Sequence, residues 1–210
     1  MIHTDMIAKI CTAAPVIPVL TIDRVQDAQP LARALVAGGL PALEITLRTD
    51  AAMEAIAAVA EVEGALAGVG TLLTTAQIRD AKSAGATFGV SPGATDSIIK
   101  AAQDYDLPLL PGAATATEAM RLLEQGFVFQ KFFPAEAAGG APALGSMAGP
   151  LPQITFCPTG GVTPENAKTY LALPNTRCVG GSWIAPKALI DAGDWEQITQ
   201  IARRAADLLA

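Results

Sequence analysis

Short apolar runs alternate along the chain with longer stretches in which apolar residues recur every three or four positions. The short runs predict β-strands, and the longer stretches, such as the one with Ile98, Ile99 and Ala102 on one face, predict helices. The predicted strands are residues 16–20, 42–47, 65–71, 86–91, 107–112, 127–133, 154–160 and 176–182. The predicted helices are residues 25–39, 51–62, 75–85, 94–105, 115–126, 164–173 and 194–209.

The order of these elements predicts a single barrel domain. Strands end in Gly, Pro, Ser or Thr, and a strand–helix unit recurs about every twenty residues, which is typical of parallel strands joined by crossover helices. Eight units predict a (β/α)8 TIM barrel that spans residues 1–210, with a short helical segment before the first strand. The alternative is an open doubly wound sheet, but residues 19–24 lack the glycine-rich turn expected after its first strand.

The first apolar stretch, residues 10–20, has some likeness to a signal peptide. Pro15 and Pro18 interrupt it and Asp5 precedes it, so we interpret the stretch as the first core strand. No apolar run reaches the ~18 residues of a membrane-spanning helix, and we therefore expect no membrane association.

Composition narrows the choice of partner and compartment. Of the 210 residues, 51% are hydrophobic, which is enough for one sizeable core, and the net charge of -6 comes without a basic stripe. We therefore expect no nucleic-acid partner. The three cysteines, Cys11, Cys157 and Cys178, form no disulfide framework in the sequence, which fits a reducing compartment such as the cytoplasm.

A lysine and a glutamate are predicted to meet inside the barrel. Lys131 lies in the apolar segment FVFQKFFP, residues 127–134, although lysine is rarely buried without a partner. Side chains alternate between the two faces of a strand, so Glu44 points inward if Leu43 and Ile45 face the helices. By the same alternation, Lys131 shares a face with Phe129 and Phe133, and if that face also points inward, Lys131 and Glu44 enter one cavity. Both residues then lie toward strand ends, where TIM barrels carry their active sites.

A lysine amine in this cavity has a specific chemical use. Four phenylalanines are expected to exclude water from it: Phe127, Phe129, Phe132 and Phe133. A neutral amine attacks a ketone to form a Schiff base, and a nearby carboxylate such as Glu44 can move the protons as general base and acid. Two structural alternatives stay open, namely a buried ion pair without chemistry and a lysine that extends its amine to solvent.

Metal-assisted cleavage of a carbon–carbon bond would need several histidine ligands. The chain has one histidine, His3, which is expected to be an exposed residue of the N-terminal tail. We therefore expect neither a metal nor another cofactor.

Two glycine pairs follow the last two predicted strands, in the segments PTGGVTPEN and VGGSWIAP. Loops after strands seven and eight are the usual phosphate site of this barrel, because glycines let backbone N–H groups approach an anion closely. Gly160, Gly161, Gly181 and Ser182 are the candidate phosphate ligands. Thr163 is predicted to cap the helix that follows. The alternative is that the glycines simply make tight turns.

Arg48 and Thr71 are candidates for binding a substrate carboxylate. Arg48 lies at or just past the end of the second strand, where its fork of N–H donors suits a carboxylate, and Thr71 ends the segment GVGT. Arg48 could equally be a surface residue before a helix cap, and Thr71 could merely begin a loop.

Seven segments together resemble one enzyme family. They occur in the order LEITLRT, GVGT, VSPG, PGAATATE, KFFPAE, PTGGVTPEN and VGGSW. The family is that of the 2-keto-3-deoxy-6-phosphogluconate (KDPG) aldolases, which also cleave 4-hydroxy-2-oxoglutarate (KHG), and the resemblance covers most of the chain. The pair KFFPAE and LEITLRT is the most specific part.

The resemblance implies a class I aldolase on a (β/α)8 barrel, assembled as a homotrimer, without a cofactor. It implies that Lys131 is the Schiff-base lysine and that Glu44 is the general acid and base. It assigns Arg48 and Thr71 to the pyruvate carboxylate, and it places Pro92 and Phe133 in the pocket. The phosphate ligands that it implies are Gly160, Gly161, Gly181 and Ser182.

The implied ligands are a phosphorylated keto sugar acid and pyruvate. Val69 and Ala114 depart from the family pattern, which expects alanine and serine there, and they leave the substrate preference slightly open. Three alternatives remain: a sugar-phosphate isomerase or epimerase, an aldolase for the C4-epimeric 2-keto-3-deoxy-6-phosphogalactonate, and a non-catalytic barrel that senses a keto acid.

Overall fold

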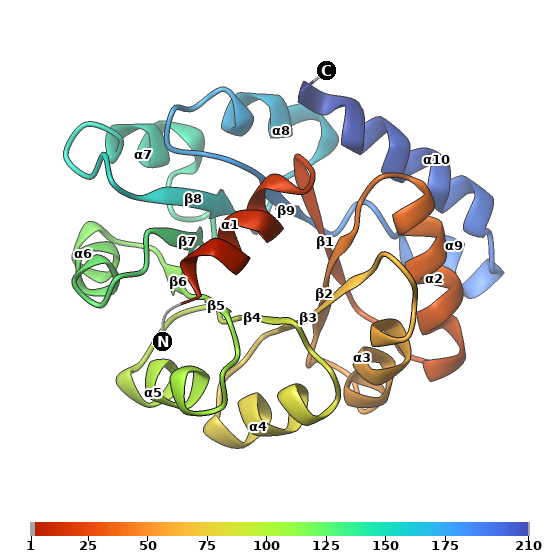
Figure 1. Ribbon diagram of the computed structural model, residues 1–210. Helices are drawn as coiled ribbons and strands as arrows, with labels where there is room; N and C mark the ends of the chain where they lie inside the picture. Colours follow the sequence, from red (N-terminus) through yellow and green to blue (C-terminus); the bar gives the residue numbers. More distant parts are fainter. Residues whose placement is uncertain (1–2, 210) are drawn as a thin grey trace.

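A computed structural model describes residues 3–209 and shows a ring of parallel strands surrounded by helices (Figure 1). The strands follow the chain around the ring. They are β1 (Val16–Leu20), β2 (Ala42–Thr46), β3 (Leu66–Gly70), β4 (Phe88–Val90), β5 (Leu109–Leu110), β6 (Gly112–Ala113), β7 (Phe129–Phe132), β8 (Thr155–Pro158) and β9 (Val179–Gly181).

Two curled parallel sheets make up this ring. One has the order β5-β4-β3-β2-β1-β9 and the other the order β6-β7-β8. Pro111 separates β5 from β6 and divides what the sequence predicts as one strand, because proline has no N–H to donate to a sheet ladder. Parallel bridges from Phe156 to Thr176 and from Thr159 to Gly180 join β8 to the segment of β9. The predicted (β/α)8 barrel class is confirmed.

The helices lie on the outside of the ring, apart from the first. They are α1 (Thr4–Thr12), α2 (Val25–Ala37), α3 (Ala52–Ala60), α4 (Thr75–Ser83), α5 (Asp96–Asp104), α6 (Ala116–Glu124), α7 (Gly140–Ser146), α8 (Pro164–Leu171), α9 (Lys187–Ala192) and α10 (Trp195–Ala206), followed by a short 3-10 helix (Asp207–Leu209). The sequence did not predict α7 and α9. Several of the predicted helices have a threonine as N-cap, and Thr163 is the N-cap of α8, as predicted.

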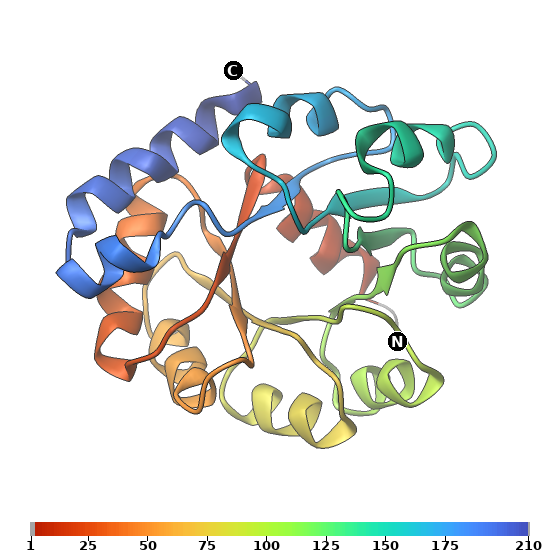
Figure 2. The same ribbon diagram turned by 180° about the vertical axis from the view of Figure 1, so that it is seen from behind.

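Helix α1 lies across one end of the barrel. Its buried residues Ile7, Ile10 and Cys11 belong to one apolar cluster with residues near the beginning of strands, such as Ile17 and Phe88. Figure 1 shows the helix in front of the ring, and Figure 2 shows it behind the strands. The N-terminal ends of the strands are therefore covered, which leaves the C-terminal ends for a substrate.

The N-terminal segment differs from the sequence-based expectation in two ways. The stretch 10–20 is not one strand, because residues up to Thr12 finish α1 and β1 begins only at Val16. His3 is not an exposed tail residue, since its side chain is 24% exposed and its Nε2 lies 2.9 Å from Oδ1 of Asp106. Because α1 packs against the barrel, His3, which directly precedes this helix, lies against the barrel as well.

Larger apolar residues fill the layer between strands and helices. Phe132 and Phe156 are buried there with an edge-to-face geometry and a centroid distance of 6.2 Å. Leu43 and Ile45 of β2 belong to the same cluster. Because side chains alternate along a strand, Glu44 and Thr46 therefore point into the barrel. Within residues 3–209, no helix is long and apolar enough to cross a membrane.

Candidate active site

Lys131 and Glu44 meet inside the barrel. Lys131 Nζ donates a hydrogen bond to Oε1 of Glu44 across 3.1 Å, and the two side chains are only 6% and 4% exposed. They lie on β7 and β2, which are not neighbouring strands. Alternation along β2 and β7 predicted this meeting on the condition that the face of Lys131 points inward, and the hydrogen bond shows that it does. The alternative in which the lysine extends its amine to solvent is wrong.

Gly70 makes room for the carboxylate of Glu44. The residue ends β3, the strand next to β2, and a Cβ atom at this position would lie 2.4 Å from Oε1 of Glu44. Real Cβ atoms essentially never approach another atom that closely. Any side chain at Gly70 would therefore displace the carboxylate from its place beside Lys131.

The phenylalanines near Lys131 do not form the predicted cuff around its amine. Phe133 does lie close, with its ring centroid 5.2 Å from Nζ. Phe127 and Phe132 instead pack in the layer between strands and helices, and Phe129 packs toward the α1 end. Phe132 is next to Lys131 in the strand, so alternation turns its ring to the opposite face. Burial inside the barrel, rather than an aromatic cuff, removes the amine from water.

Arg48 and Thr71 follow two paired strands at the same end of the barrel. Thr46 of β2 is the register partner of Gly70 of β3, and the N–H of Leu47 donates to the carbonyl of Gly70. Arg48 is exposed, and Thr71 is partly buried with a φ of 61°. This φ is unusual for a β-branched residue, and such strain concentrates at functional sites.

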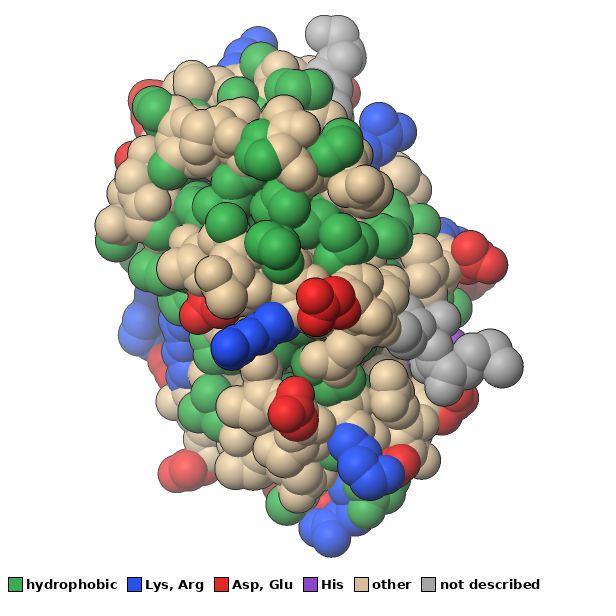
Figure 3. All heavy atoms as spheres, turned by 90° about the vertical axis from the view of Figure 1, so that its left-hand side faces the viewer, with side chains coloured by type: hydrophobic (Ala, Val, Ile, Leu, Met, Phe, Trp, Pro, Cys, Tyr) green, Lys and Arg blue, Asp and Glu red, His purple; other side chains and the backbone are tan. Residues whose placement is uncertain are grey.

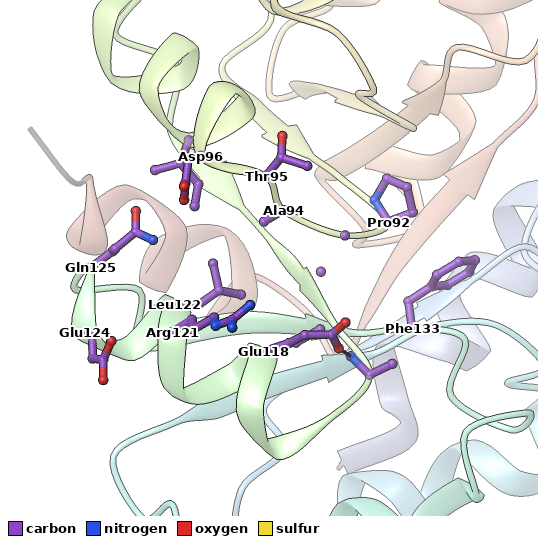
Figure 4. Close-up of a pocket in the computed structure, with 15 residues that line it drawn as sticks. Pro92, Ala94, Thr95, Asp96, Glu118, Arg121, Leu122, Glu124, Gln125 and Phe133 are labelled. Atoms are coloured by element: carbon purple, nitrogen blue, oxygen red, sulfur yellow. Dashed lines mark hydrogen bonds between the residues drawn. The ribbon is translucent and has the colours of Figure 1, made fainter.

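Pro92 and Phe133 lie at one end of a groove of about 560 Å³ between α5 and α6 (Figure 4). Charged side chains line its walls, among them Asp96 of α5 and Arg121 of α6. Lys131 and Glu44 do not belong to its lining. The groove therefore adjoins the buried pair through the ring of Phe133 without containing it.

One carboxylate of this groove is already engaged with the backbone. Glu118 accepts hydrogen bonds from the N–H groups of Ala114 and Thr115, at 2.8 and 2.9 Å, at the start of α6. The bond from Ala114 is the main reason that the pKa of Glu118 lies below its ordinary value. Glu118 thus serves the capping box of α6.

The two glycine pairs come together at the C-terminal end of the barrel. The bridge between Thr159 and Gly180 brings the start of the Gly160–Gly161 turn beside Gly181 and Ser182. Gly160 and Gly161 have φ values of 99° and 79°, which favour glycine. In the part of the chain that the structure describes, the N–H groups of Gly161 and Ser182 donate to no protein acceptor. These N–H groups are thus free to bind an anion.

Two buried threonines lie on inward faces beside the candidate site, and the sequence reasoning gave neither of them a role. Thr46 is two residues beyond Glu44, is buried, and donates to the carbonyl of Leu20. Thr159 is buried two residues beyond Cys157, which is the register partner of Lys131. Alternation puts Thr46 on the face of Glu44, as the sequence reasoning noted, and it puts Thr159 on the face of Cys157. Between His3 and Leu209, no group of three or more His, Cys, Asp or Glu side chains is arranged to hold a metal ion.

Comparisons with known proteins agree with this geometry. Residues 7–201 match the family model for KDPG and KHG aldolases. The KHG/KDPG aldolase of Escherichia coli K12 is 47% identical over 200 residues, which cover 95% of this chain and 94% of that protein.

Solved structures extend the likeness to the fold. The KDPG aldolase of Zymomonas mobilis ZM4, solved with 3-phosphoglycerate, has a TM-score of 0.93 and 47% identity, covering 98% of this chain and 97% of that one. The KDPG aldolase of Legionella pneumophila holds pyruvate as a covalent carbinolamine intermediate. Its TM-score is 0.91 with 45% identity, covering 94% of this chain and 97% of that one.

Proposed function

The chain belongs to the KDPG and KHG aldolase family, and on this premise we propose that its buried Lys131–Glu44 pair performs the chemistry of a class I aldolase. The enzyme cleaves KDPG to pyruvate and D-glyceraldehyde 3-phosphate. It also cleaves KHG to pyruvate and glyoxylate. The observation that carries the residue assignment is the 3.1 Å contact between Nζ and Oε1 inside the barrel.

Lys131 supplies the covalent step. Its neutral amine attacks the C2 ketone of the substrate, and loss of water converts the carbinolamine to an iminium ion. The iminium is the electron acceptor for cleavage of the bond between C3 and C4. No metal is needed for this step, because the positively charged nitrogen takes up the electron pair.

Glu44 moves the protons. Its carboxylate removes the proton of the C4 hydroxyl as the C3–C4 bond breaks, and the aldehyde product leaves. The protonated Glu44 gives this proton to C3 of the enamine that remains on Lys131, and water then hydrolyses the resulting iminium to release pyruvate. Lys131 and Glu44 thus return to their starting state.

The ends of the substrate are held by separate groups. Arg48 and Thr71 bind the pyruvate carboxylate, where the fork of the guanidinium matches two carboxylate oxygens. The N–H groups of the Gly160–Gly161 turn, together with Gly181 and Ser182, bind the phosphate. Pro92 and Phe133 line the pocket between the two ends.

A coupled assay tests this function. Purified protein is incubated with KDPG or with KHG, and pyruvate is measured by its reduction with lactate dehydrogenase. Release of pyruvate from both substrates supports the proposal. An isomerase, an epimerase or a keto-acid sensor would release none, and that result would overturn it.

We also propose that the enzyme is a homotrimer that works in the cytoplasm. Figure 3 shows that hydrophobic side chains gather on the face that carries α6 and α7, and association of chains would bury them. The three buried cysteine thiols are unpaired, which suits a reducing compartment. Light scattering should give about three times the 21.5 kDa of one chain, and a mass of one chain would contradict the trimer.

A further inference from the structure

A buried tyrosine and a loop glutamate form a pair just behind the Gly160–Gly161 turn. The hydroxyl of Tyr170, on α8, donates a hydrogen bond to Oε1 of Glu136, which belongs to the loop after β7. Tyr170 has no exposed surface, whereas Glu136 is exposed as a residue. In residues 3–209, no hydrogen bond joins this pair to Lys131 or Glu44, so the cleavage chemistry does not explain it.

We propose that Tyr170 and Glu136 are positioning residues that hold the Gly160–Gly161 turn in the shape that receives the phosphate end of the substrate. This role rests on the proposed function, because it concerns the same turn and the same substrate. It adds a specificity device to that function, because KDPG carries a phosphate for the turn and KHG does not.

Glu136 supports the turn through its backbone N–H and through the Cβ and Cγ atoms of its side chain. Its N–H donates to the carbonyl of Gly160 at 3.0 Å, and the preceding N–H of Ala135 donates to the carbonyl of Thr159 at 2.8 Å. Its Cβ and Cγ pack against Gly161 so closely that a Cβ on Gly161 would lie 2.6 Å from the Cγ. The position of the Glu136 side chain therefore sets the position of the turn.

The turn is held from its other side by α8 itself. Nδ2 of Asn166 donates to the carbonyl of Gly161 at 3.1 Å, and Oδ1 of the same side chain accepts from the N–H of Thr163 at 2.8 Å. Both carbonyls of the Gly160–Gly161 turn thus have protein donors. The N–H of Gly161 remains without an acceptor in residues 3–209, which leaves it free for an anion.

Tyr170 keeps the Glu136 side chain against the turn. Burial, followed by the hydrogen bond to Glu136, raises the pKa of the phenol well above its ordinary value, so the hydroxyl stays a donor through the neutral and alkaline range. A carboxylate on an exposed loop would otherwise sample several rotamers. Without the hydroxyl, the stem of Glu136 would no longer be held against Gly161.

The experiment compares two substrates on one variant. Tyr170→Phe removes only the hydroxyl, and KM is measured with KDPG, which has a phosphate, and with KHG, which has none. We expect KM for KDPG to rise about tenfold, the effect of losing one hydrogen bond to a charged group, while KM for KHG and both kcat values change less than about twofold. Glu136→Gln, which keeps an acceptor oxygen for the phenol, should show a smaller rise than Glu136→Ala.

The matched control is Thr87→Val, which removes a hydroxyl bonded to the carbonyl of Ala67 at the N-terminal end of the barrel. It should leave the ratio of the two KM values unchanged. Equal losses with both substrates in Tyr170→Phe, or no change with either, would overturn the proposal. If Tyr170→Phe does not fold, as seen by its thermal melt, Glu136→Ala on the exposed loop replaces it. A selective rise in KM for KDPG then supports the proposal, and equal losses or no change overturn it.

A binding measurement separates this proposal from the proposed function. Inorganic phosphate is titrated into wild-type protein and Tyr170→Phe, and the amide resonance of Gly161 is followed by NMR. Weaker phosphate binding in the variant supports the role of the pair even if neither substrate is cleaved. Equal binding in both proteins contradicts the role of the pair, whereas absence of cleavage by the wild type contradicts only the proposed function.

Discussion

Lys131 Nζ and Glu44 Oε1 are 3.1 Å apart although their residues lie 87 positions apart in the chain and on strands that are not neighbours. The contact therefore crosses the interior of the barrel. Both side chains are almost completely buried, and a buried ion pair of this kind is costly to desolvate. A reaction that uses the amine and the carboxylate in turn explains why the barrel keeps them.

Glu44→Gln should preserve the fold and lose most of the activity. The amide is similar in size and can still accept a hydrogen bond from Lys131, but it cannot take a proton. We expect kcat to fall by about 10² to 10⁴, as is typical for a general acid–base group. The measurement is pyruvate release from KDPG, with circular dichroism as the check on folding. Undiminished turnover would assign the proton transfers to another group.

Gly70→Ala should displace the carboxylate of Glu44. The new Cβ would lie 2.4 Å from Oε1, so the carboxylate must move away from Lys131. We expect kcat to fall about 100-fold, within the range of general acid–base catalysis. Overpacking should lower the free energy of unfolding by about 1–3 kcal/mol.

Gly149→Ala is the matched control for Gly70→Ala. A Cβ at Gly149 would meet nothing within 4 Å, so both the activity and the stability should stay close to wild type. If Gly70→Ala is as active as Gly149→Ala, the space at Gly70 is not what positions Glu44.

Thr71→Gly should not lower the stability of the protein. The φ of 61° at Thr71 is strained for a β-branched residue, at a cost of about 1–3 kcal/mol that glycine avoids. We expect the free energy of unfolding to stay equal or to rise by up to about 1 kcal/mol. If Thr71 binds the substrate carboxylate as proposed, KM for KHG should rise. Thr155→Gly in β8 is the control and should lose about 1 kcal/mol, since glycine weakens an extended strand. A similar loss in both variants would show that Thr71 is not strained.

Glu118→Gln should lower the free energy of unfolding more at neutral pH than at acidic pH. Hydrogen bonds from the N–H of Ala114 and its neighbour hold the pKa of Glu118 in the folded state below its ordinary value of 4.5. The carboxylate thus stabilises the folded chain at neutral pH, and this contribution is lost as the pH falls below 4.5 and through the lower, folded-state pKa.

Urea unfolding at pH 7 and at pH 3 measures this effect of Glu118. Glu118→Gln should be less stable than wild type at pH 7, and the difference should shrink at pH 3. Glu124→Gln, which changes an exposed glutamate on the same helix, is the control and should leave the free energy of unfolding close to that of wild type. A difference for Glu118→Gln that stays constant or grows toward pH 3 would contradict the prediction.

Much of the barrel could be predicted from the sequence because apolar runs and helical spacing mark its elements directly. Alternation along two strands also predicted the meeting of Lys131 and Glu44, provided that the face of Lys131 points inward. The same rule places Phe132 on the face opposite Lys131, so the aromatic cuff was an error that the sequence could have prevented.

Other features depend on the folded chain. Helix α7 has the sequence GAPALGS, whose glycines and proline hide a helix from any propensity argument. The pairing of Tyr170 with Glu136 likewise arises from tertiary packing. No local pattern marks a hydrogen bond between residues 34 positions apart.

The proposed chemistry depends on a covalent Schiff base between Lys131 and a keto acid, and reductive trapping detects that bond. The protein is incubated with pyruvate, reduced with borohydride, digested and analysed by mass spectrometry, with Lys131→Ala treated in the same way. We predict a pyruvate-derived mass on the peptide that contains Lys131, and none in the variant. An unmodified wild-type protein, or a label on another lysine, would contradict covalent catalysis by Lys131.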